Sequence, residues 1–193
     1  MTASYIEPLS QAAIIESGIF DGVGSWFLRQ AMGNEALFIG ISPLNPKVYR
    51  DSGNSLYFTH KNFTDFAKID WDAYIPSVVD RERTLIFFDD HQAATRRIHE
   101  SRELGFRHVM FDDNYLPGLG DNLSAKMACE PQLYKAILGE NHTFEMLDDF
   151  ASRRQTSSRE EFHAISSRFY DDIDTYAEFP PVWRGPSRFG SRV

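Results

Sequence analysis

The chain has 193 residues, of which 42% are hydrophobic and 14% aromatic, so it can bury a substantial core and a largely disordered chain is excluded. Its formal net charge of −8 argues against a generally basic surface for nucleic-acid binding. The single cysteine, Cys129, excludes a disulfide within this sequence and a cysteine-rich zinc site.

Neither a targeting segment nor a membrane span is recognisable. Residues 1–11 lack the basic region and apolar core of a signal peptide. No apolar stretch reaches the ~20 residues that a transmembrane helix needs. We therefore expect a single cytoplasmic domain over residues 1–193 that binds neither nucleic acid nor membrane.

Short apolar runs alternate with helix-like segments in the first 115 residues. The predicted strands are 11–15, 36–41, 55–59, 85–88 and 108–111. The predicted helices between them are 25–32, 71–79 and 93–104. This alternation predicts an α/β fold with a mostly parallel, twisted sheet flanked by helices. The core would cover about residues 12–115, and residues 116–193 would form a helical and irregular substrate or lid region.

A glycine-bearing turn follows the first predicted strand. Glu16 ends the strand, and Gly18, Gly22 and Gly24 precede the first predicted helix. Glycine lets a ligand approach the backbone closely, and the N–H groups that begin a helix favour anionic ligand groups. The spacing differs from the G-x-G-x-x-G pattern of nicotinamide-binding turns, and a tight turn without ligand is the structural alternative.

Two acidic clusters close the fourth and fifth predicted strands. Asp, Asp and His occupy 89–91, and Asp, Asp and Asn occupy 112–114. In a parallel sheet both clusters would lie at the carboxyl ends of adjacent strands, where such folds bind ligands. Neighbouring carboxylates repel each other, and a divalent cation between them relieves the repulsion. The clusters therefore predict an active site, with capping of the strand ends as the structural alternative.

Together these features resemble the class I S-adenosylmethionine-dependent methyltransferases. They are most similar to the metal-dependent small-molecule O-methyltransferases and to the cephalosporin-hydroxylase-like and macrocin-type branches. The resemblance covers about residues 12–115 and implies a Rossmann-like methyltransferase fold. It further implies S-adenosylmethionine and a divalent cation as cofactors, and a hydroxyl of a small molecule or sugar as the methyl acceptor.

The resemblance also implies roles for individual residues. His91 would take the proton from the acceptor, because Ala93 stands where the catechol-type enzymes have a lysine base. The implied metal ligands are Asp90, Asp113 and Asn114, an oxygen-only set that suits magnesium. The implied cofactor contacts are Glu16, Gly18, Gly22, Ser42, Asp65 and Asp90. Side chains alternate along a strand, so one Asp of each pair is expected to cap a helix, and the sequence leaves open which one.

Two departures from the family pattern, the absence of the lysine base at Ala93 and a change at Ser42, keep two other functions open. Ser42 stands where these families usually have an acidic residue that binds the ribose hydroxyls, and a serine cannot make that charge-assisted contact. The alternatives are a metal-dependent enzyme of the same fold that acts on a sugar or phosphorylated ligand without methyl transfer, and a non-catalytic binding subunit.

Three further expectations concern packing and assembly. Trp26 and Phe27 are predicted to lie in the core. Arg96, Arg97 and Arg102 are predicted to form a solvated helix face. Many proteins of the resembled fold are dimers, so a homodimer is kept as an alternative to a monomer.

Overall fold

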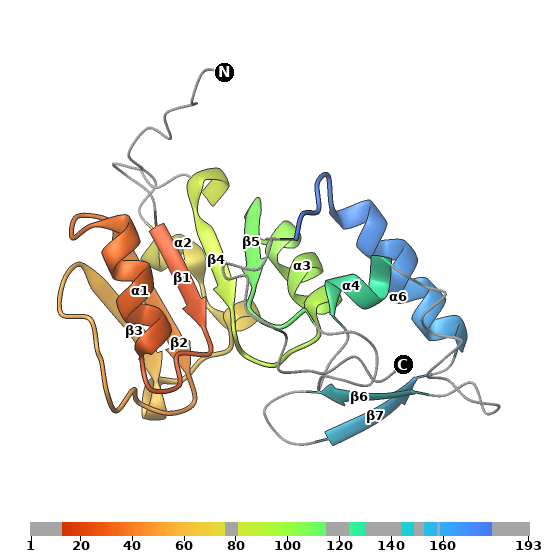
Figure 1. The fold of residues 1–193 in the computed structure, drawn as a ribbon, viewed down its shortest axis with the longest axis horizontal. Coiled ribbons are helices and arrows are strands. Elements are labelled where there is room, and N and C mark those ends of the chain that lie inside the picture. Colours follow the sequence, from red (N-terminus) through yellow and green to blue (C-terminus); the bar gives the residue numbers. More distant parts are fainter. Residues whose placement is uncertain are drawn as a thin grey trace, which may run out of the picture.

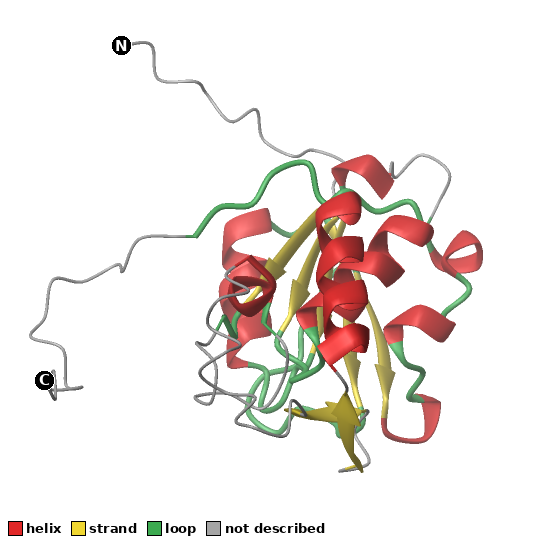
Figure 2. Cartoon of the chain, turned by 90° about the vertical axis from the view of Figure 1, so that its right-hand side faces the viewer, coloured by secondary structure: helices red, strands yellow, loops and turns green. Residues whose placement is uncertain are grey.

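The computed structural model describes residues 13–75, 81–114, 124–129, 144–148, 153–157 and 159–178. Five strands form an all-parallel sheet in the order β3-β2-β1-β4-β5 (Figure 1). They are β1 (Ala13–Ser17), β2 (Leu37–Ser42), β3 (Ser55–Thr59), β4 (Leu85–Phe88) and β5 (His108–Phe111). Helices flank the sheet on both sides (Figure 2). The predicted α/β, Rossmann-like arrangement is therefore confirmed.

The helices within the described residues are mostly short. The α-helices are α1 (Val23–Met32), α2 (Trp71–Tyr74), α3 (Ala94–Glu103), α4 (Ala125–Cys129) and α6 (Arg159–Asp172). Three 3₁₀ turns are η1 (His60–Asn62), η2 (Phe66–Lys68) and η3 (Arg81–Arg83). None of the helices in the described part of the chain combines the length and the apolar character needed to cross a membrane.

A second, smaller sheet consists of β6 (Phe144–Asp148) and β7 (Arg153–Ser157), which pair antiparallel. Figures 1 and 2 both show this pair beyond the carboxyl ends of the parallel strands. β6 and β7 do not extend the parallel sheet, so β5 is its edge strand within the described residues.

The order of the strands creates a switch point between β1 and β4. From β1 the chain proceeds outward through β2 to β3, and it then returns to form β4 and β5 on the other side. Ser17 pairs with Phe88, and Phe88 pairs with Phe111, so these three strands end in register. The residues that follow each strand meet at one edge, where doubly wound sheets bind ligands.

The core explains why these runs form strands. All five residues of β1 are buried, as expected for a parallel strand that is covered on both faces. Isoleucines of β1, β2 and β4 pack with four aromatic side chains, Phe66, Trp71, Phe88 and Phe106. A second cluster joins α3, α4 and α6 through Ala94, Ile98, Ala125, Ala128 and Phe169.

Two predictions about packing were wrong. Arg97 does not lie on a solvated face, because its side chain is fully buried. Trp26 and Phe27 lie on the outer side of α1, where both are exposed. Helix α1 instead turns Ser25 and Arg29 inward, and these polar side chains bind buried carboxylates.

Candidate metal centre

A tight contact between the turns after β1 and β4 positions the first acidic cluster. Gly18 has φ +102°, and a Cβ atom added there would lie 1.9 Å from the carbonyl oxygen of Asp89. The Asp89 N–H donates to the Ser17 carbonyl at 2.8 Å and continues the pairing of the strands. Only glycine allows both the positive φ and this close approach. The β1 turn therefore holds the backbone of Asp89 in place.

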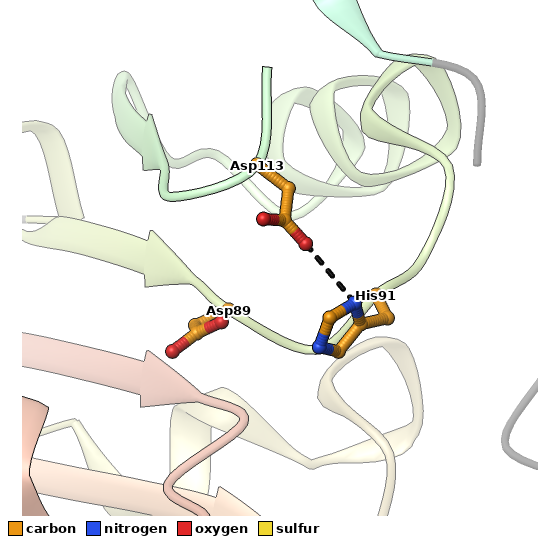
Figure 3. A group of neighbouring side chains, drawn as sticks. All are labelled: Asp89, His91 and Asp113. Carbon is orange, nitrogen blue, oxygen red and sulfur yellow. Dashed lines mark ion pairs between the residues drawn. The ribbon is translucent and has the colours of Figure 1, made fainter. Parts of the chain in front are cut away.

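Asp89, His91 and Asp113 come together at the ends of β4 and β5 (Figure 3). One ligand atom from each residue lies within 4.8 Å of those of the other two. His91 Nδ1 is 3.0 Å from Asp113 Oδ2, and the imidazole is 60% exposed. His91 also has φ 55°, an uncommon conformation for a side-chain-bearing residue that recurs at functional sites.

The electrostatics of this cluster favour a bound cation. The pKa of Asp89 is raised to about 6, chiefly by burial and then by the charges of Asp112 and Asp113, while His91 opposes the rise. Two carboxylates and further water ligands suit Mg²⁺, which is usually held by one or two protein carboxylates. An imidazole ligand in addition would shift the preference toward Mn²⁺ or another transition metal. The donor set therefore fits a divalent cation.

Of the three implied metal ligands, the structure places only Asp113 in this cluster. Asp90 is buried, accepts a hydrogen bond from Ser17 Oγ at 2.7 Å and pairs with Arg97 Nη2 at 2.8 Å. Asn114 Nδ2 donates to the Tyr176 hydroxyl at 2.7 Å. Its Oδ1 accepts from the first turn of α4. Asp90 and Asn114 therefore hold neighbouring elements together, and Asp89 occupies the position beside Asp113.

Glu16 lies beneath α1 rather than in an open crevice. Its side chain is almost fully buried and accepts a hydrogen bond from Ser25 Oγ. A Cβ atom on Gly24 would lie only 2.5 Å from Glu16 Oε1, so α1 rests directly on the carboxyl group. The pKa of Glu16 is raised to about 7, chiefly by burial, with the Ser25 hydrogen bond opposing the rise and the charge of Asp89 adding to it.

Because the pKa of Glu16 is raised, we expect Glu16→Gln to increase the stability of the folded protein in a pH-dependent way. For an acid whose pKa rises from 4.5 to about 7 on folding, the contribution to stability is complete below pH 4.5 and is lost as the pH rises through about 7. Glutamine does not titrate. Urea unfolding should show the variant more stable than the wild type above pH 7, by on the order of 2–3 kcal/mol, and similar to it near pH 4.5.

The matched control is Glu35→Gln, because Glu35 is an exposed glutamate at the approach to β2. It should leave the pH profile of stability as in the wild type. If Glu16→Gln kept the pH profile of the wild type, ionisation of Glu16 would not destabilise the folded protein, and the prediction would be wrong.

The remaining implied cofactor contacts divide into two groups. Gly22 and Ser42 lie at the carboxyl side of β1 and β2, and Ser42 Oγ accepts from the Leu44 N–H at 3.4 Å. A Cβ atom on Gly22 would lie 1.9 Å from the Tyr49 carbonyl oxygen, so this glycine packs two loops together. Asp65 caps η2 and pairs with Arg97 at 2.8 Å. Its carboxylate is therefore part of the interior network.

A groove of about 860 Å³ runs along β5, and none of the three cluster residues is among those that line it. Its lining includes apolar side chains of β5 and α6, among them Val109, Phe111 and Phe169. It also reaches Asp112 and Asn114, the two neighbours of Asp113 in the chain. The sequence pattern does not predict this groove, because the groove forms between β5 and the segment after α6, which are far apart in the chain.

Comparison with known proteins does not assign a function to this chain. Neither models of protein families, nor curated proteins, nor solved structures give a match to this chain. The chemistry of the described residues is what supports a function.

Proposed function

We propose that this protein is a divalent-cation-dependent methyltransferase that transfers the methyl group of S-adenosylmethionine to a hydroxyl of a small molecule or sugar. The observation that carries the proposal is the convergence of Asp89, His91 and Asp113 beside the switch point of a Rossmann-like sheet. Carboxylates at that edge fit a cation, and the methyl transfer is inferred from the family that the motifs resemble.

The residues of the cluster would divide the work. Asp89 and Asp113 would hold the cation. When bound there, the cation would lower the pKa of the acceptor hydroxyl. His91 would accept the proton at Nε2, because its Nδ1 lies against Asp113 and the exposed ring can reach a ligand. Gly18 would keep the backbone of Asp89 in position.

The groove beside β5 supports a small-molecule acceptor. Its apolar wall could bury part of such a molecule, and its lining reaches Asp112 and Asn114, the chain neighbours of Asp113.

A second candidate function rests on a separate observation. Three of the implied cofactor contacts, Glu16, Asp65 and Asp90, have their carboxylates bound to Ser25 or Arg97 inside the protein. Ser42 adds no charge. Because these positions speak against the implied cofactor contacts, the second candidate is the alternative without methyl transfer, a metal-dependent enzyme of the same fold that acts on a sugar or phosphorylated ligand.

Calorimetric titration distinguishes the two functions. We expect S-adenosylmethionine and its demethylated product to bind with micromolar dissociation constants, and S-adenosylmethionine to bind more tightly when Mg²⁺ is present. The gain from Mg²⁺ should be lost in Asp113→Asn, which removes a proposed cation ligand. Cation binding without cofactor binding would reject methyl transfer in favour of the second candidate. Absence of both would reject an enzymatic role for the cluster.

A further inference from the structure

Helix α1 turns polar side chains toward the sheet and exposes apolar ones, the opposite of what a helix that packs on a sheet usually does. Its buried residues are Ser25 and Arg29. Arg29 forms a buried ion pair with Asp51 at 2.8 Å and donates to carbonyl groups after the helix. Three of its large apolar side chains instead face outward, with Val23, Trp26 and Phe27 exposed by 51, 43 and 63%, while Leu28 and Met32 are partly buried. A surface helix normally buries such residues.

The exposed apolar surface continues from α1 into two loops. Phe20, before the helix, is 75% exposed, and Val48, after β2, is 72% exposed. The Val48 N–H donates to the Asp21 carbonyl at 3.0 Å, so these loops lie against each other. Leu44 in the same loop is also exposed. We call this surface the α1 patch, defined by Phe20, Val23, Trp26, Phe27, Leu44 and Val48.

We propose that the α1 patch is the contact between two copies of this chain, related by a twofold axis. Apolar patches at the upper end of the size that monomeric proteins expose are often functional, and larger ones mark interaction sites. From the exposed fractions, the six side chains leave on the order of 600 Å² of apolar surface per copy. A symmetric contact would then bury about 1,200 Å², the lower bound of a stable, specific interface.

Charge supports a second copy as the occupant. The net charge of −8 makes two copies repel each other over most of their surfaces. Residues 22–28, which include the helical part of the patch, contain no charged side chain, and Arg29 is buried against Asp51. The charges next to its loop residues have both signs, with Asp21 beside Phe20 and Lys47 beside Val48. Two copies can therefore meet at this helix without opposing like charges. An isologous contact needs only a self-complementary apolar surface.

The proposed contact leaves the candidate metal centre open. The patch lies on α1 and on the loops after β1 and β2, whereas the cluster lies at the ends of β4 and β5. Dimerisation through the patch therefore does not involve the cation cluster, whereas the loops that it covers also carry Gly22 and Ser42, two of the implied cofactor contacts.

Sedimentation equilibrium of the full chain tests the proposal. We expect the wild type to dimerise with a dissociation constant in the micromolar range and Phe27→Asp to raise it at least ~10-fold, because a charge would be buried on both sides of the axis. Phe27→Leu, which keeps the position apolar, should dimerise like the wild type. Leu56→Asp, which changes an exposed apolar residue on β3 outside the patch, should have no effect.

Since Phe27 is exposed, neither of its variants should disturb the fold, which circular dichroism would verify. Trp26→Ser provides a second disruption of the same surface. A wild type that stays monomeric at about 100 µM would overturn the proposal. So would a dimer that persists in both Phe27→Asp and Trp26→Ser.

Discussion

Asp89→Asn and Asp113→Asn are each expected to abolish the rise in unfolding temperature that Mg²⁺ gives the wild type. The two carboxylates come from different strands and lie in one cluster with His91. Each is a proposed ligand, and ligand binding stabilises the folded state only as far as the binding site is intact. Thermal unfolding with and without Mg²⁺ measures the effect, and any methyl transfer should fall at least ~100-fold in both variants.

Whether Asp89→Asn is more or less stable than the wild type depends on whether the cation is bound. The pKa of Asp89 is raised to about 6, so its contribution to folding is complete below its ordinary value of 3.8 and is lost as the pH rises through about 6. The metal-free Asp89→Asn protein should therefore be more stable than the metal-free wild type at neutral pH. The same variant should be less stable than the wild type in saturating Mg²⁺.

Asp112→Asn is the matched control, because it changes an exposed neighbouring carboxylate outside the cluster. It should keep most of the response to Mg²⁺. A full Mg²⁺ response in both Asp89→Asn and Asp113→Asn would show that the cluster is not the cation site.

Arg97→Met is expected to destabilise the protein by about 3–5 kcal/mol. The guanidinium is completely buried and lies 2.8 Å from the carboxylates of Asp65, Asp90 and Glu100. Removing it would leave the buried Asp90, and Asp65 with a side chain only 11% exposed, without their counter-charge. Urea unfolding measures the loss as a lower midpoint with an unchanged slope.

Arg102→Met on the same helix is the control. Its side chain is 46% exposed, and its nitrogen lies 3.7 Å from Asp172, so this pair should contribute less than about 1 kcal/mol. Equal losses in Arg97→Met and Arg102→Met would contradict the assigned role of the interior network.

The strands of the parallel sheet could be predicted because their signal is local. Each is a short apolar run bounded by turn-forming residues, and the observed bounds differ from the predicted ones by at most two residues. The acidic clusters were predicted to share one edge because parallel strands in register must end together. Both inferences depend on backbone geometry, which the pattern of apolar residues largely determines.

The sequence of β4 alone does not show whether Asp89 or Asp90 faces the metal centre, because all four residues of the strand are apolar. Along β4, Ile86 and Phe88 are buried more deeply than Leu85 and Phe87, and Asp90 continues the buried side. The counter-ion of Asp90 is Arg97, seven residues later in α3. A buried arginine has no local signature, because an amphipathic pattern assigns arginine to solvent. The wrong prediction for Arg97 and the open choice between the two aspartates thus have one origin.

The orientation of α1 was beyond prediction for a similar reason. Ser25 and Arg29 turn inward because Glu16 and Asp51 need partners in the interior. Those carboxylates come from β1 and from the segment between β2 and β3, and only the folded arrangement brings them to the helix. A pattern based on hydrophobicity therefore assigns Trp26 and Phe27 to the core, whereas the ion pair directs them outward.

Anomalous diffraction from crystals grown with Mn²⁺ in place of Mg²⁺ tests the metal centre most directly. We expect one strong anomalous peak per chain at roughly 2.0–2.3 Å from carboxylate oxygens of Asp89 and Asp113, and no peak there in crystals of Asp113→Asn. Contact with His91 Nε2 or Nδ1 would make this residue a third ligand instead of the proton acceptor. The absence of a peak between Asp89 and Asp113 in the wild type would contradict the proposed function.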